Sequence, residues 1–233
     1  MFRTFVVVVF VIFSSSVFGQ DTVNITDLRG HKQGYWRKTD SVGQLIYVGH
    51  FKDGFPIGEF RYYYPNGKLK TVSLLSNQGK RAVTNSYFIN GMKMASGIYI
   101  NEKKDSIWHF YSEENGKMVS EELYKNGLID GYSKLFFPEG GLSEVNVYKQ
   151  GIRDGLWEQY YQEGKIKLRG AFKAGEKQGA LKIFYPSGQT MITGQYNAGH
   201  QDGTWFYYNE KGTTEKKETY RNGMLIKAEE SPK

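Results

Sequence analysis

The stretch GLWEQYYQEGKIKLRGAFKAGEKQ, residues 155–178, is followed by further stretches of the same design, which begin at Gly179 and Gly203. Both intervals are 24 residues long. A fixed period of this size is typical of an architecture that stacks identical supersecondary units. The period therefore decides the fold before any single motif is interpreted.

Counting back from Gly155 in the same step gives eight units, one of which is a residue longer because of the stretch SEENG at 112–116. The units start at Gly34, Gly58, Ala82, Ser106, Gly131, Gly155, Gly179 and Gly203. They cover residues 34–226. The segment 20–33 is expected to be a lead-in outside the repeat, and the segment 227–233 a charged, lightly ordered tail.

Glycines mark the turns within each unit. Every unit carries one nine residues after its start, or ten in the longer Ser106 unit, and six units carry a second near position 20. Runs of seven to ten residues rich in Tyr, Phe and Trp separate these glycines, which is typical of strand, turn, strand, turn. The sequence therefore predicts an all-β fold: an elongated, twisted antiparallel β-meander of about eight tandem 24-residue β-hairpins.

The offsets within a unit also predict which side chains share a face. With the hairpin turn centred on Glu163 and Gly164, residues whose offsets sum to 17 pair across the strands and point the same way. One face of the Gly155 unit then holds Trp157, Gln159, Tyr161, Ile166, Leu168 and Phe172, and the other holds Glu158, Tyr160, Gln162, Lys165, Lys167, Arg169 and Ala171.

The Gly131 and Gly203 units fit this division less well than the others. Glu144, Asn146, Lys216 and Glu218 fall on the face that is apolar elsewhere. This departure indicates a bulge or an open face in those two units.

The stretches YKQGIRDGLWEQYYQEG (148–164) and YNAGHQDGTWFYYNEKG (196–212) resemble the MORN repeat. They are most similar to the variant MORN-like repeats of bacterial proteins named YwqK-family antitoxins. Thr39, Ala82 and Ser106 depart from the repeat pattern. The resemblance implies an elongated β-meander that has no catalytic centre and acts as a scaffold or binding surface. The antitoxin label is a family name and by itself establishes no activity.

The first residues, MFRTFVVVVFVIFSSSVFGQ, differ from everything that follows. A positive residue, an apolar run and a small-residue stretch predict a secretory signal peptide over residues 1–19, cut before Gln20. The apolar run is shorter than the ~20 residues that cross a bilayer, which makes a retained anchor the lesser alternative. The mature chain is therefore expected to have no transmembrane segment and to be exported to the periplasm, the cell envelope or the outside.

Composition and motifs argue against several function classes. The net charge is +7, but charges of both signs alternate and no nucleic-acid module is visible, so nucleic acid is not an expected partner. The chain has no cysteine, and its four histidines fall at unrelated offsets. It also lacks the GxSxG, GxxxxGK[ST] and HExxH motifs. The sequence thus predicts a protein that is not an enzyme and that uses no cofactor or metal.

One acidic column recurs, just before the unit starts: Asp105, Asp130, Asp154 and Asp202. Neighbouring units lie two strands apart, which separates these carboxylates by roughly 9–10 Å. Calcium ligands lie ~2.3–2.6 Å from the ion, so carboxylates of different units cannot share one. Aspartate before glycine is instead expected to serve the turn.

The candidate binding residues are aromatic and occupy the fifth position after the unit start in seven units: Tyr63, Tyr87, Tyr111, Phe136, Tyr160, Phe184 and Tyr208. The pairing scheme puts them on the more polar face, flanked by Lys165, Lys167, Arg169 and Lys182. Such a column can seat a partner's side chains or stack on a glycan. The alternative is that the rings cover the backbone and pack on one another along the sheet.

The sequence favours a non-catalytic, exported scaffold that binds another protein and resembles an antitoxin or immunity protein. The alternative function is a module that binds a cell-wall glycan through the aromatic column. Exposed rings in a row form an apolar patch large enough to need a partner in either case.

Overall fold

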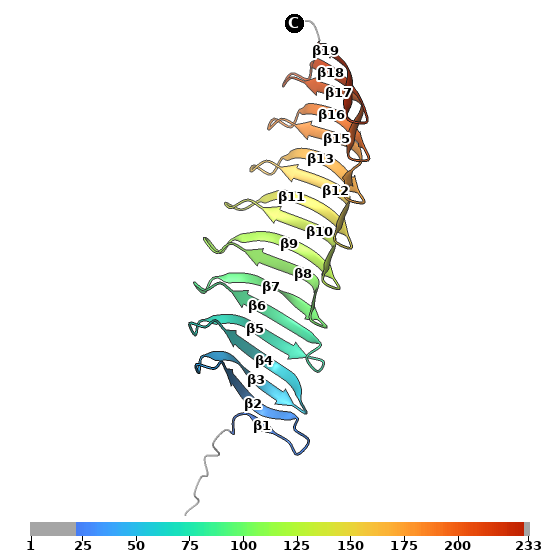
Figure 1. Ribbon diagram of the computed structural model, residues 1–233. Helices are drawn as coiled ribbons and strands as arrows, with labels where there is room; N and C mark the ends of the chain where they lie inside the picture. The colour runs from blue at the N-terminus through green and yellow to red at the C-terminus, as the bar shows by residue number, and fades with distance from the viewer. Residues whose placement is uncertain (1–21, 231–233) are drawn as a thin grey trace, which may run out of the picture.

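The computed structural model describes residues 22–230. They form one antiparallel meander whose hairpins stack in a single file, so that β1 and β19 lie at opposite ends of the sheet (Figure 1). No helix occurs in this part of the chain. The predicted all-β meander is thereby confirmed, whereas the predicted signal peptide at 1–19 lies outside the described residues.

The strands run through the whole described part of the chain. They are β1 (Ile25–Thr26), β2 (Lys32–Thr39), β3 (Leu45–Lys52), β4 (Phe55–Tyr63), β5 (Leu69–Ser76), β6 (Arg81–Tyr87), β7 (Lys93–Ile100), β8 (Lys103–Tyr111), β9 (Met118–Lys125), β10 (Leu128–Phe136), β11 (Leu142–Lys149), β12 (Ile152–Tyr160), β13 (Ile166–Lys173), β14 (Glu176–Lys177), β15 (Gly179–Phe184), β16 (Thr190–Asn197), β17 (His200–Tyr208), β18 (Thr214–Arg221) and β19 (Met224–Glu230).

The eight predicted units are the hairpins from β2–β3 to β17–β18, with β14 and β15 together forming the first strand of the seventh. The short strand β1 pairs with the outer edge of β2. At the other end the sequence predicted a loose tail from residue 227. That boundary was wrong, because β19 pairs with β18 from Arg221↔Met224 to Lys216↔Glu230 and so extends the sheet by one more strand.

The tight turns between hairpins account for the second glycine that six units carry. Between hairpins, a two-residue turn such as Asn222–Gly223 has positive φ at both residues (49° and 80°), as a type I′ turn requires. Its glycine N–H donates to the carbonyl oxygen of Gln201, 22 residues upstream, at 2.9 Å. Equivalent bonds recur from unit to unit and tie the turns of one sheet edge together.

The predicted register holds along most of each hairpin. In the Gly155 unit the pairs run from Gly155↔Phe172 to Gln159↔Leu168, as the offset rule requires. The next pair is Tyr160↔Ile166, which leaves Lys167 as an extra residue in a one-residue bulge. Ile166 therefore shares the face of Tyr160, and its predicted place beside Trp157 was wrong.

A second irregularity lies where one hairpin meets the next. The pairing of β3 with β4 changes from Val48↔Arg61 to His50↔Ile57, so β4 contains two extra residues opposite Gly49. The unit-start glycine, here Gly58 at φ 67°, adopts the left-handed conformation at this bulge. The same two-residue shift recurs at most unit starts.

The Ala82 unit differs in how it places these residues. Strands β5 and β6 pair without any shift, from Thr71↔Ser86 to Ser76↔Arg81. Their connection is correspondingly longer, since it has four residues, 77–80, where the other units have two. Ala82 does not have the positive φ of the unit-start glycines, and the two extra residues lie in the turn and not in a bulge.

The core lies on one face of the sheet, and large rings there cover glycines of the neighbouring strand. Phe60, Trp108 and Trp205 are only 2%, 2% and 3% exposed. A Cβ atom added to the facing Gly97 would lie 2.3 Å from the ring of Trp108. The absence of a side chain at such glycines is what lets a single sheet bury a ring against its own backbone.

The polar residues of the Gly131 and Gly203 units do lie on this face, but bulges occur throughout the repeat and do not explain them. Glu218 is buried and accepts hydrogen bonds from Tyr207 and Tyr220 at 2.6 and 2.9 Å. Glu144 accepts hydrogen bonds from the side chains of Asn146 and Gln159. Side-chain hydrogen bonds, in place of an open face, accommodate these groups.

Candidate binding faces

The sheet presents two faces, here called the column face and the ring face. The column face carries the seven candidate residues Tyr63, Tyr87, Tyr111, Phe136, Tyr160, Phe184 and Tyr208. The ring face is opposite and carries Phe60, Trp108, Trp157 and Trp205. On the column face, Phe206 stacks beside Tyr208 with ring centroids 6.3 Å apart, and the Tyr160 hydroxyl donates to Glu158 at 2.6 Å.

Each of the seven candidates ends the first strand of its hairpin and is half-buried. The structure brings them to one face but not into contact, since no aromatic pair joins consecutive members within residues 22–230. The carbonyl oxygens of three members accept hydrogen bonds from tyrosine hydroxyls of the preceding unit; Tyr161, for example, donates to Phe184 at 2.7 Å. The column is thus held in place by its backbone, and its rings are left partly free.

Charged side chains alternate in sign along the same face. Glu121 bonds Lys134 on one neighbouring strand at 2.7 Å and His109 on the other at 3.2 Å. The hydrogen bond from Lys134, assisted by the one with His109, keeps the pKa of Glu121 below its ordinary value. The polar rim around the column is therefore charged at neutral pH.

Tyr160 is the column member most strongly tied to this rim. Burial and the hydrogen bond to the ionised Glu158 raise the pKa of Tyr160 to about 12. Glu158 also accepts from Arg169 at 2.7 Å, and these bonds outweigh burial to hold its pKa below the ordinary value. The phenol therefore stays neutral and donates throughout the physiological range.

The predicted flank of the column needs one correction. Arg169 and Lys182 pair across strands on the column face, in the row that contains Glu158. Lys167, by contrast, is the bulged residue, and its ammonium lies 5.9 Å from the ring centroid of Tyr161. The bulge removes this lysine from the regular row beside the column.

One member of the acidic column, Asp154, serves a turn as predicted, whereas Asp105 accepts a hydrogen bond from the Ser106 hydroxyl. Asp154 accepts a hydrogen bond from the turn N–H of Ala174 at 3.1 Å, and Gln33 and Gln178 make the equivalent bond in their units. No group of three or more His, Asp or Glu side chains in residues 22–230 is arranged to hold a metal ion. Nor does this part contain a helix long and apolar enough to cross a bilayer.

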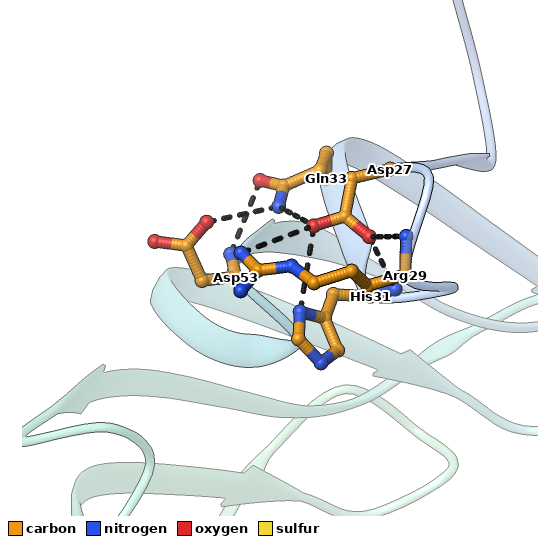
Figure 2. Close-up of polar contacts among 5 residues, drawn as sticks. All are labelled: Asp27, Arg29, His31, Gln33 and Asp53. Atoms are coloured by element: carbon orange, nitrogen blue, oxygen red, sulfur yellow. Dashed lines mark hydrogen bonds and ion pairs between the residues drawn. The ribbon is translucent and has the colours of Figure 1, made fainter.

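The first hairpin is closed by a polar cap (Figure 2). The carboxylate of Asp27 accepts hydrogen bonds from the backbone N–H groups of Arg29 and His31 at 2.8 and 2.9 Å. The bond from His31 is the main cause that holds the pKa of Asp27 below its ordinary value. Gln33 bridges Asp27 and the turn residue Asp53. These contacts join the lead-in to the sheet.

A groove on the ring face was not anticipated from the sequence. It has a volume of about 540 Å³ and lies over β5, the last strand of the Gly58 unit, and β6, the first strand of the Ala82 unit. Its floor consists of the hydroxyl residues Thr71, Ser73, Thr84 and Ser86, and its walls include Tyr62 and Tyr99. The one signal in the sequence was the departure of Ala82 from the repeat pattern.

The fold and its two continuous faces define an antiparallel β-hairpin repeat protein. Five segments match the family model described as the MORN repeat variant: residues 56–75, 110–126, 153–174, 177–198 and 201–222. These five segments are therefore similar to the MORN repeat variant, and MORN repeats are generally modules that bind proteins or membranes.

No curated protein matches the chain. Among solved structures, a chain in the crystal structure of TcdB2-TccC3-Cdc42 is 9% identical with a TM-score of 0.22. The match covers 83% of this chain and 13% of that one. A protein of unknown function from Bacteroides fragilis is 8% identical with a TM-score of 0.12, over 86% of this chain and 94% of its own. At such scores neither likeness carries an argument.

Proposed function

We propose that this protein is a non-catalytic scaffold that is exported and binds another protein along the column face. The observation that carries the proposal is the row of seven half-buried rings on one face, set among charged side chains of both signs. Protein interfaces have this composition, with aromatic residues at the centre and a polar rim. The general role of MORN-variant repeats supports the same function.

The spacing of the rings bears on the shape of the partner. Consecutive members lie two strands apart, roughly 9–10 Å. A partner that touches several of them must extend along the file of hairpins, and each ring then contributes a separate anchor. Rigid aromatic rings lose little conformational entropy on binding, which suits them to this role.

Export is part of the proposal and rests on the apolar segment at residues 1–19. Mass spectrometry of the protein from the producing cell should give a chain that begins at Gln20. The resemblance to YwqK-family antitoxins extends the proposal to an immunity role. An exported antitoxin does not meet a cytosolic target, so such a role requires a toxin that acts in the envelope.

A crosslinking pull-down from envelope extract tests the proposal. The bait is compared with a variant carrying Tyr111→Ala, Tyr160→Ala and Tyr208→Ala, and with a matched control in which the same positions become Phe. The wild type and the Phe control are expected to recover the same protein, and the folded Ala variant is expected to lose it. Equal recovery by all three baits would refute binding through the column. Recovery of wall polysaccharide in place of protein would establish the glycan-binding alternative.

A further inference from the structure

The groove in the Ala82 unit marks a gap in the row of rings on the ring face. In most units the residue two positions after the unit start covers a residue of the preceding hairpin. Phe60 covers Gly49, Trp108 covers Gly97 and Trp205 covers Gly194. In the Ala82 unit the equivalent pair is Thr84 and Ser73. A small residue therefore stands at a position where five of the eight units supply a ring.

The floor of the gap is small and polar. The hydroxyls of Ser73 and Thr84 lie 2.9 Å apart, and those of Thr71 and Ser86 lie 3.3 Å apart. In each pair the two hydroxyl groups hydrogen-bond to each other, and these short side chains leave the space above them open. Rings of the flanking strands border the open space: Phe60 and Tyr62 on β4, and Tyr99 on β7.

A second unit also lacks the ring, but there the space is filled. Ser133 stands at the equivalent position of the Gly131 unit and pairs with Glu122. Glu122 accepts hydrogen bonds from Ser120 and Tyr124 at 3.1 and 2.6 Å, and the ammonium of Lys104 lies over the Tyr124 ring. In the Gly131 unit, side chains of the protein itself therefore occupy the space, whereas the groove at Thr84 is open.

Lysine side chains accompany the rings on this face. Two residues before the unit start, Lys32 lies 4.6 Å from the ring centroid of Trp36, and Lys104 lies 4.9 Å from that of Trp108. Lys80 holds the same position in the Ala82 unit and lines the groove. Within residues 22–230, no ring contact or ion pair engages its ammonium group. Lys80 thus supplies the cation of this lysine–ring contact in the Ala82 unit, but the aromatic ring that the contact has in other units is missing.

We propose that this groove binds an aromatic side chain, tryptophan above all, presented by a partner protein. Such a ring would take the place that Trp108 takes in the next unit, between aromatic walls and beside the ammonium of Lys80. Cations favour the electron-rich face of a ring, and indole is the best of these. The other charged residue of the lining is Glu102, of opposite sign, so the groove favours a neutral ring. The inference rests on the proposed protein-binding function in one respect: it takes the ring to come from a partner protein.

Titration of the ¹⁵N-labelled protein with N-acetyltryptophanamide tests the site directly. Saturable amide shifts are expected at Ser73, Thr84 and their neighbours, and N-acetylleucinamide should bind about two- to ten-fold more weakly. Lys80→Gln should weaken the binding of the indole about two- to five-fold. Lys182→Gln, a lysine of the column face, serves as the matched control and should change nothing. Absent shifts, shifts confined to the column face, or tighter binding of a chitin oligosaccharide than of indole would overturn the proposal.

A filled groove provides the second test. The double variant Thr84→Trp/Ser73→Gly recreates the pair that Trp108 and Gly97 form in the next unit. It is expected to melt no lower than the wild type and to lose indole binding. If that variant does not fold, Thr84→Leu replaces it, since Leu181 occupies the same position over Gly170. A folded, filled variant that still binds indole at the wild-type level would refute the site.

The outcomes for the groove and for the column are distinguishable. The groove and the column lie on opposite faces of the sheet, so the proposal requires a partner that extends around the sheet edge, and such a partner should also bind the filled-groove variant more weakly. Loss of the partner from the column variant alone would leave the scaffold function standing and reject the groove as its anchor. Loss from the filled-groove variant alone would reject the column and retain the groove.

Discussion

Gly97→Ala is expected to destabilise the sheet strongly, although alanine is a common strand residue elsewhere in this chain. The new Cβ atom would lie 2.3 and 2.4 Å from two ring carbons of Trp108. Favourable carbon–carbon contacts are about 3.5–4.0 Å, so the overlap exceeds an ångström. Gly97 does not have positive φ, so backbone strain does not contribute. The cost is therefore steric and depends on the ring.

The magnitude follows from how firmly the ring is held. Trp108 is 2% exposed, and its indole N–H donates to the carbonyl oxygen of Ile98 at 3.0 Å. Overpacking of a core typically costs about 1–3 kcal/mol. A shift of the ring also weakens its hydrogen bond, which contributes about 0.5–1.5 kcal/mol. The local free energy of unfolding should accordingly fall by about 2–4 kcal/mol.

Native-state hydrogen exchange is the appropriate assay, because a repeat protein can open in parts and a single global transition is not assured. The amides of β7 and β8 should lose protection, while those of β17 and β18 should change little. Gly164→Ala is the contrast. A Cβ there meets nothing within 4 Å, and the expected loss of about 1–2 kcal/mol comes from its φ of 82° alone.

A double-mutant cycle decides whether the ring is the cause. In a Trp108→Leu background, Gly97→Ala should cost at least about 1 kcal/mol less, since leucine can move away from the new methyl group. An equal cost in both backgrounds would refute the steric argument. Unchanged protection in the single variant would refute it as well.

Two further predictions concern polar contacts. Glu121→Gln should lower stability at neutral pH and flatten its acid dependence. Lys134 and His109 lower the pKa of Glu121 in the folded state. The stabilising contribution of Glu121 is therefore fully present above its unfolded pKa of about 4.3, and it is lost as the pH falls through its folded pKa. A variant with an unchanged acid unfolding curve would contradict this. Tyr161→Phe removes the hydrogen bond to the Phe184 carbonyl and should cost about 0.5–1.5 kcal/mol locally, measured by exchange of the β15 amides, and no change there would show that the bond adds nothing.

Much of the fold could be predicted because the 24-residue period determines the positions of the strands and turns. Glycines at two fixed positions determine where each strand reverses, and the pairs from Gly155↔Phe172 to Gln159↔Leu168 follow from counting between them. The bulge at Lys167 could not be predicted by the same arithmetic. Counting fixes how many residues lie between two turns, but the backbone geometry decides which of them is left unpaired.

The residues of the column share one face because the bulge falls in the second strand of the hairpin and leaves the alternation of the first strand unchanged. The groove was not predicted. Ala82 was visible as a departure from the pattern, but its effect depends on how the neighbouring strands are arranged in space. Two residues shift from a bulge into the turn at 77–80, and a ring is missing between rings that remain. Such a vacancy can be recognised only after neighbouring units are placed beside each other.

The central claim is that the column face binds a protein, and site-specific photocrosslinking in the producing cell tests it most directly. A benzophenone amino acid is placed at Tyr111 or Tyr160 on the column, and at Glu210 in an exposed hairpin turn as the control. The account predicts one discrete protein adduct from both column positions and none from the turn. Adducts from the turn alone, or none from either column position, would contradict it.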